Sequence, residues 1–130
     1  MKKQAIVPPV GSHIIIDLYD CRASCLDDIE TLKNILIESA KISNTTILDV
    51  KFHKFNPQGV SGYVLISESH LSIHTWPEYN YASVDVYTCG NNALPTKATD
   101  YIIEKLQCKK PAVIKLERGI YAEKFKPDDG

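Results

Sequence analysis

The sequence lacks the features that mark membrane-spanning, secreted or nucleic-acid-binding proteins. No apolar run reaches the ~18 residues that a membrane helix needs. The N-terminus begins basic but reaches Pro8 and Pro9 before any signal-like apolar segment can form. Its 15 basic and 16 acidic side chains give a net charge of −1, so no polycationic surface indicates nucleic acid. We therefore expect a cytoplasmic protein without membrane or nucleic-acid partners.

Cysteine is too infrequent for a disulfide-rich domain, and its spacing matches no common metal-binding framework. The four cysteines are Cys21, Cys25, Cys89 and Cys108. Cys21 and Cys25 are not spaced as C-x2-C, and no second pair lies at a distance that would complete a zinc site. A disulfide framework is typical of secreted proteins, and nothing else in the sequence indicates secretion. We expect free thiols and no bound metal.

What the sequence does contain is the composition of one globular domain, residues 1–130, with 44% apolar and 24% charged residues. Helical periodicity marks residues 27–43, where Asp27 and Glu30 fit a capping box. Apolar residues then recur at threes and fours to form one stripe: Leu26, Ile29, Leu32, Ile35, Leu36 and Ala40. A second helix is predicted over residues 96–107.

Strand patterns surround these two helices. They cover residues 13–19, 45–55, 60–67, 71–76, 81–88 and 111–117. The resulting order is βαββββαβ, with hairpin-sized links among the central strands. This order predicts an α+β fold, a two-layer sandwich in which two main helices cover one face of a mostly antiparallel sheet.

Alternation along two of these strands separates polar from apolar side chains. His70, Ser72, His74 and Trp76 share one side of their strand, and Leu71, Ile73 and Thr75 share the other. In the next strand, Ser83, Asp85, Tyr87 and Cys89 lie opposite Val84 and Val86. A sheet with one polar face can hold a functional site, a partner subunit or both.

Reactive side chains are densest over residues 68–78, where two strands meet. Taken singly, each has an ordinary structural interpretation. Ser69 is then a hydroxyl at a strand end, His74 is a histidine on a sheet face, and Cys89 is a small buried apolar residue. Phe55 is then a core aromatic. Only the longer pattern around these residues favours catalysis.

Four runs carry that pattern: Phe52-His53-Lys54-Phe55, residues 57–62, residues 66–78 and residues 81–90. Together they resemble the small bacterial and archaeal form of S-adenosylmethionine decarboxylase, a pyruvoyl-dependent enzyme of polyamine synthesis. Weaker similarity extends to residues 11–13, 17–21 and 118–119, so the resemblance covers most of the chain. The central run is long and chemically unusual.

The resemblance implies a proenzyme that cuts its own Glu68–Ser69 bond, giving a β chain 1–68 and an α chain 69–130. The Ser69 hydroxyl would attack the preceding carbonyl, a reaction that gains from proximity because both groups belong to adjacent residues. Loss of the Ser69 Cα proton would then eliminate the Glu68 carboxylate. The remaining dehydroalanine would rearrange and hydrolyse to a pyruvoyl group, the covalent cofactor of the family.

Further roles follow from the same resemblance. His74 matches the base that removes the proton in this elimination, and imidazole suits that task. Ser61 matches a serine that assists processing through a hydrogen bond. Cys89 matches the proton donor in decarboxylation, and a thiol is mostly protonated at pH 7. Phe55 matches an aromatic that stacks on adenine, and Glu78 matches a carboxylate that binds the ribose hydroxyls.

In that family, the substrate amine forms a Schiff base with the pyruvoyl ketone, which accepts the electrons released as carbon dioxide leaves. The implied product is decarboxylated S-adenosylmethionine, the aminopropyl donor for spermidine. The implied assembly is a homodimer of αβ protomers with sites at the interface. An uncovered sheet face fits this assembly, because 130 residues leave little to cover it from within.

Two alternatives remain open on the sequence alone. A pyruvoyl-dependent arginine or ornithine decarboxylase would keep the cofactor and change the pocket, although Phe55 and Glu78 favour a nucleoside substrate. In Gly11-Ser12-His13, Ser12 stands where the family more often has a basic residue. The N-terminal side of the substrate pocket therefore departs from the family pattern. The second alternative is a metal-binding or non-catalytic module built from His53, His70, His74, Glu68 and Cys89. It leaves the Glu68–Ser69 pair unexplained.

Overall fold

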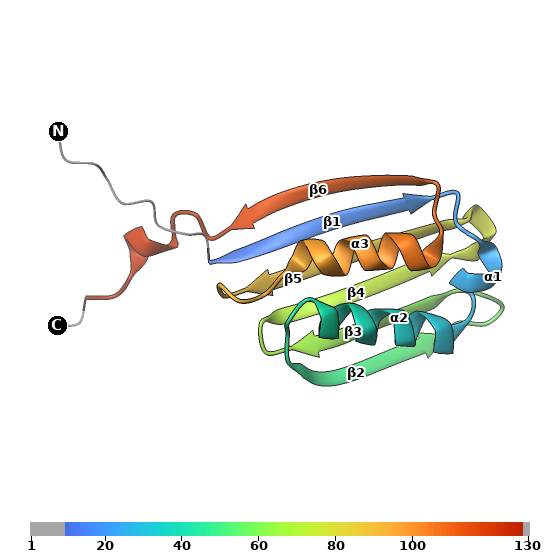
Figure 1. The fold of residues 1–130 in the computed structure, drawn as a ribbon, viewed down its shortest axis with the longest axis horizontal. Coiled ribbons are helices and arrows are strands. Elements are labelled where there is room, and N and C mark those ends of the chain that lie inside the picture. Colours follow the sequence, from blue (N-terminus) through green and yellow to red (C-terminus); the bar gives the residue numbers. More distant parts are fainter. Residues whose placement is uncertain (1–9, 129–130) are drawn as a thin grey trace.

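The computed structural model describes residues 10–128, which form a sheet with helices on one side (Figure 1). The strands are β1 Gly11–Tyr19, β2 Ile47–Lys54, β3 Val60–Ile66, β4 Ser69–Trp76, β5 Tyr81–Cys89 and β6 Lys110–Arg118. The helices are α1 Ala23–Leu26, α2 Ile29–Ile42 and α3 Pro95–Leu106, with 3₁₀ turns η1 Pro77–Tyr79 and η2 Ala122–Phe125. Among the described residues, no helix has the length and apolar character to cross a membrane.

The six strands form one sheet in the order β2-β3-β4-β5-β1-β6, and every neighbouring pair is antiparallel. Helices α2 and α3 lie side by side over the same face (Figure 1). The predicted α+β class and element order are therefore confirmed. The first strand of the chain, β1, lies between the last two strands, β5 and β6, rather than at an edge of the sheet.

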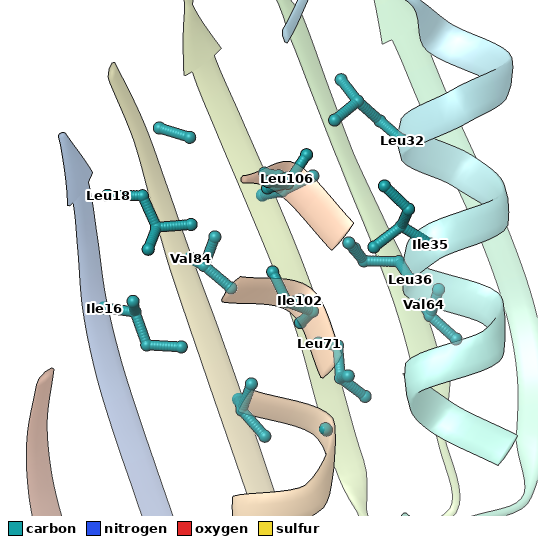
Figure 2. Packing of buried hydrophobic residues seen from close by; sticks show 14 of the residues in the cluster. Ile16, Leu18, Leu32, Ile35, Leu36, Val64, Leu71, Val84, Ile102 and Leu106 are labelled. Carbon is teal, nitrogen blue, oxygen red and sulfur yellow. The ribbon is translucent and has the colours of Figure 1, made fainter. Parts of the chain in front are cut away.

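The core fills the space between the helices and the sheet. Figure 2 shows the α2 residues Leu32, Ile35 and Leu36 and the α3 residues Ile102 and Leu106 facing the strand residues Ile16, Leu18, Val64, Leu71 and Val84. Burying each large aliphatic side chain contributes roughly 1.5–3 kcal/mol. Alternation along each strand then leaves the polar side chains on the face that the helices do not cover, as the sequence predicts.

The start of the first helix differs from the prediction. The segment forms the short α1, breaks, and starts again as α2, so Asp27 is not the cap. Asp28 has that role, because its carboxylate accepts a hydrogen bond from the Thr31 N–H at 3.2 Å. That bond also lowers the pKa of the Asp28 carboxyl. Either aspartate is a favoured N-cap residue, so residue type alone does not choose between them, and the predicted capping box of Asp27 with Glu30 was wrong.

The expectation of four free thiols was wrong for two of the cysteines. Cys21 and Cys108 form a disulfide across 87 positions of sequence, while Cys25 and Cys89 are free. The antiparallel pairing of β1 with β6 sets Tyr19 opposite Lys110, so the residues that follow β1 meet those that precede β6. Sequence spacing carries no trace of this proximity, which arises from the strand order.

Candidate active site

The turn between β3 and β4 holds its backbone in a strained conformation. Ser69 has a φ of +127°, a region that L-amino acids rarely adopt. Such a conformation costs on the order of 1–3 kcal/mol and persists only where the surroundings impose it. Here, the Ser67 N–H donates to the Thr46 carbonyl at 2.9 Å, and the Thr46 N–H donates to a Glu68 carboxylate oxygen at 3.1 Å. The second bond lowers the pKa of the Glu68 carboxyl, which keeps this anchor ionised.

The carbonyl of Glu68 has a hydrogen-bond donor of its own. The Cys89 N–H donates to this oxygen at 2.7 Å. Attack on the carbonyl would place negative charge on that oxygen, and a fixed N–H donor stabilises such charge. The resemblance drew attention to the Cys89 side chain, but it missed the backbone group. A backbone donor has no residue signature, and only the β4–β5 register reveals it.

The same register brings Cys89 to the predicted cleavage point. Ser69 pairs with Thr88 across β4 and β5, and Cys89 is the next residue along β5. The Cys89 thiol is free and half-buried. Glu68, Ser69 and Cys89, the predicted cleavage site and proton donor, therefore form one cluster at one end of the sheet. We call these three residues the cleavage cluster.

A second cluster gathers the other predicted residues. Ser61 Oγ and His74 Nδ1 are 2.9 Å apart on paired positions of β3 and β4. Both line a cavity of about 270 Å³ with Phe55, Gln58, Gly59, Thr75, Trp76 and Glu78. Ser61, His74, Phe55 and Glu78, four residues predicted from sequence, thus share one pocket. We call them the pocket cluster.

Within one chain, the two clusters do not meet. Ser69 and His74 are five residues apart along the extended strand β4, a separation of about 17 Å. The pairings agree, because Ser69 lies opposite Thr88 and His74 lies opposite Ser83. The predicted base therefore does not reach the predicted nucleophile of its own chain.

The remaining histidines lie apart from each other. His53 packs edge-on against Phe55, with ring centroids 4.6 Å apart, and His70 packs edge-on against Tyr87 at 5.8 Å. Within residues 10–128, no group of three or more His, Cys, Asp or Glu side chains is placed to hold a metal ion. The metal-binding alternative has no such group among the described residues to support it.

The middle of the open face carries a polar network that sequence reasoning did not identify. His13 Nε2 lies 2.9 Å from Asp85 Oδ1, and the His13 ring stacks on Tyr87. The Tyr81 hydroxyl donates to Asp17 at 2.6 Å, and burial, followed by this hydrogen bond, raises the pKa of Tyr81 to about 12. The strand alternation of polar residues is the signal that could have located this network.

Comparisons with known proteins identify the family of the chain. The sequence profile of the S-adenosylmethionine decarboxylase family matches residues 12–119. A Thermodesulfovibrio yellowstonii protein named S-adenosylmethionine decarboxylase proenzyme is 50% identical over 115 residues, covering 88% of this chain and 85% of that protein. A Clostridium tetani protein of the same name is 47% identical over 114 residues, covering 88% and 90%.

A solved structure extends the likeness to the fold. The crystal structure of the adenosylmethionine decarboxylase from Aquifex aeolicus has a TM-score of 0.82 at 41% sequence identity, covering 87% of this chain and 93% of that one. The fold and sequence together define an enzyme of the carboxy-lyase class. The chain belongs to the S-adenosylmethionine decarboxylase family.

Proposed function

We propose that this chain is a proenzyme that cleaves its Glu68–Ser69 bond and then decarboxylates S-adenosylmethionine, releasing carbon dioxide and the aminopropyl donor used in spermidine synthesis. The observation that carries the proposal is the strained Ser69, whose preceding carbonyl already accepts a bond from the Cys89 N–H. The family's relatives are named as proenzymes, which supports cleavage. Nothing in the comparisons favours arginine or ornithine as the substrate.

Cleavage uses groups that the turn already holds. The Ser69 hydroxyl adds to the Glu68 carbonyl, the Cys89 N–H stabilises the resulting oxyanion, and the C–N bond breaks to leave an ester. Relief of the positive φ at Ser69 favours this step, because the strain is present in the uncleaved chain. A base then removes the Ser69 Cα proton, and the Glu68 carboxylate departs.

The residues at the cleavage cluster suit a pyruvoyl group at position 69. That group supplies a carbonyl conjugated to an amide, which accepts the electrons released with carbon dioxide. Cys89 is adjacent to the strand partner of residue 69, which supports its thiol as the proton donor. Its half-buried position limits competing protonation by water.

A second copy of the chain completes each site in this proposal. If two sheets pack with their open faces together, a two-fold axis lying in the interface and crossing the strands reverses the strand direction. The cleavage cluster of one chain then lies over the pocket cluster of the other, and two equal sites form. Ser61 and His74 would therefore act on Ser69 of the second copy. The separation of about 17 Å between Ser69 and His74 within one chain would then not prevent the reaction.

The open face has the apolar surface that such packing requires. Large apolar side chains are exposed there: Tyr63, Leu65, Trp76, Ile114 and Leu116. These side chains lie on β3, β4 and β6, and a facing sheet would cover them. The pocket of about 270 Å³ is also smaller than the ~300–1,000 Å³ of typical ligand sites, and a facing sheet would deepen it. Phe55 and Glu78 would then hold the nucleoside between two chains.

Intact-mass measurement followed by a decarboxylation assay tests this proposal. We expect two fragments after reduction, 1–68 and a modified 69–130, because the strained turn drives cleavage. Release of carbon dioxide is expected from carboxyl-labelled S-adenosylmethionine and not from arginine or ornithine. A hydrazine reagent should label only the 69–130 fragment, at its new end. An unbroken chain that decarboxylates would contradict cleavage, and preference for a free amino acid would contradict the substrate.

A further inference from the structure

One carboxylate holds both ends of the turn that carries Phe55. Asp27, at the junction of α1 and α2, accepts a hydrogen bond from the Gly59 N–H at 2.8 Å and pairs with Lys54 Nζ at 2.8 Å. Lys54 Nζ also donates to the Phe55 carbonyl, and the Phe55 N–H donates to the Gly59 carbonyl at 2.8 Å. The turn is thereby closed upon itself and tied to the helical layer.

A buried hydroxyl fixes the same junction to the pocket wall. Thr75 Oγ1 donates to the Leu26 carbonyl at 2.7 Å and accepts a hydrogen bond from the Val60 N–H at 2.9 Å. Thr75 is almost fully buried, so this link is protected from water. Asp27 follows Leu26 directly, and the carboxylate therefore extends from a backbone that is already held against the cavity.

We propose that Asp27 is a positioning residue for substrate binding: it holds Phe55 at the edge of the pocket, where the ring can stack on the nucleoside. This inference rests on the proposed function. Phe55 is 47% exposed, so its ring is held by the turn and by the edge-on contact with His53 rather than by the core. Asp27 does not line the pocket, and it acts through Gly59 and Lys54.

Steady-state kinetics on two neighbouring aspartates tests this role. In Asp27→Ala, the KM for S-adenosylmethionine should rise by about 3- to 10-fold, the worth of a stacking contact, with kcat within twofold and cleavage complete. Asp28→Ala is the matched control, because Asp28 caps α2 and makes no bond to the turn. It should lower thermal stability without changing KM.

Binding of 5′-methylthioadenosine, the nucleoside portion of the substrate, gives a second measurement. Its Kd should weaken by the same factor in Asp27→Ala and stay unchanged in Asp28→Ala. Equal KM values for Asp27→Ala and the parent enzyme, or equal rises in both variants, would overturn the positioning role. A parent enzyme inactive on S-adenosylmethionine would instead overturn the proposed function, and this inference with it.

The disulfide supports a second, independent inference. Cleavage would divide the sheet between two fragments, with β1, β2 and β3 in the first and β4, β5 and β6 in the second. Because β1 lies between β5 and β6, the fragments are interleaved (Figure 1). Cys21 belongs to the first fragment and Cys108 to the second, so the disulfide crosses from one to the other.

The position of the disulfide separates it from the reaction. Ser12 and Ser69 both pair with Thr88, whereas Cys21 follows Tyr19 at the other end of β1. Tyr19 lies seven positions beyond Ser12 along this extended strand, a distance of about 23 Å. Cys21 and Cys108 are 3% and 8% exposed, which shields the bond from soluble reductants. Its formation transfers two electrons and releases two protons, with a small-molecule or protein disulfide as the oxidant through thiol–disulfide exchange.

We infer that this bond keeps the two products of self-cleavage as one covalent molecule. The reference unfolded state is then a single cross-linked species rather than two separate chains, which favours refolding of the processed protein. The inference rests on the proposed cleavage at residue 69. Cys21 and Cys108 belong to neither the cleavage cluster nor the pocket cluster, and their role is to join the two fragments.

Denaturing electrophoresis of thiol-blocked protein, with and without reductant, tests the link. The parent protein should run as one species without reductant and as two fragments with it. Cys108→Ser should give two fragments in both lanes and lower Tm by on the order of 10 °C, while still cleaving. Cys25→Ser is the matched control and should behave as the parent, because Cys25 lies outside the bond.

The outcomes separate the two proposals. Two fragments from the parent protein without reductant would overturn the covalent link and leave the cleavage proposal intact. One full-length chain in both lanes would overturn cleavage, and the link between fragments with it. In that case, differential alkylation, which labels thiols before and after reduction, would still show whether Cys21 and Cys108 are joined.

Discussion

Ser69→Ala should abolish self-cleavage and decarboxylation together. The substitution removes the hydroxyl that attacks the Glu68 carbonyl, and no pyruvoyl group can form from alanine. Alanine at a φ of +127° is strained much as serine is, so we expect the fold to persist. Reduced denaturing electrophoresis should show a single 14.6 kDa chain, and carbon dioxide release should fall below detection. Circular dichroism of the purified variant checks the fold.

Two further variants make this result specific. Ser24→Ala removes an exposed hydroxyl from α1 and should cleave as completely as the parent. Ser69→Cys retains a nucleophile at the same atom position and should cleave, because a thiolate can attack the same carbonyl. Cleavage of Ser69→Ala at the same bond would show that the nucleophile lies elsewhere. Full activity of an uncleaved Ser69→Ala would exclude the pyruvoyl chemistry altogether.

The sequence predicts the fold well because the fold depends on periodic patterns. The threefold and fourfold recurrence of apolar residues in α2 and the alternation in β4 and β5 each reflect burial on one side of an element. These patterns place Leu36 and Leu71 in the core and His74 on the open face, and the structure agrees. Errors fall where two adjacent residues satisfy the same rule, as Asp27 and Asp28 do at the start of α2.

The candidate site is less predictable because its contacts are long-range. The donor to the Glu68 carbonyl is the backbone of Cys89, which only strand register reveals. Outside the site, the partner of Cys21 is likewise 87 residues away, and it becomes a neighbour because β1 pairs with β6. Motif matching places Ser69 and His74 in one functional set but is silent on whether a single chain unites them. Strand geometry supplies that answer, since an extended strand separates them.

Co-expression of two inactive variants should restore activity, if the sites form between chains. His74→Ala alone should slow cleavage by about 10²- to 10⁴-fold through loss of the base, and Ser69→Ala alone should not cleave. In a mixed dimer, Ser69 of the His74→Ala chain faces His74 of the Ser69→Ala chain, so one of its two sites is intact. Random pairing makes half of the dimers mixed, which predicts about a quarter of the parent activity.

Different affinity tags on the two chains show which of them is cut. Only the His74→Ala chain should be cleaved, and only in material that retains both tags after two successive purifications. Ser61→Ala should give the same result in place of His74→Ala. Ser61 Oγ lies 2.9 Å from His74 Nδ1, and both residues would act on Ser69 of the second copy. A mixed dimer in which neither chain is cleaved, although each variant folds and dimerises, would contradict sites shared between chains. A different base from the same chain would then have to act on Ser69, because His74 lies about 17 Å away along β4.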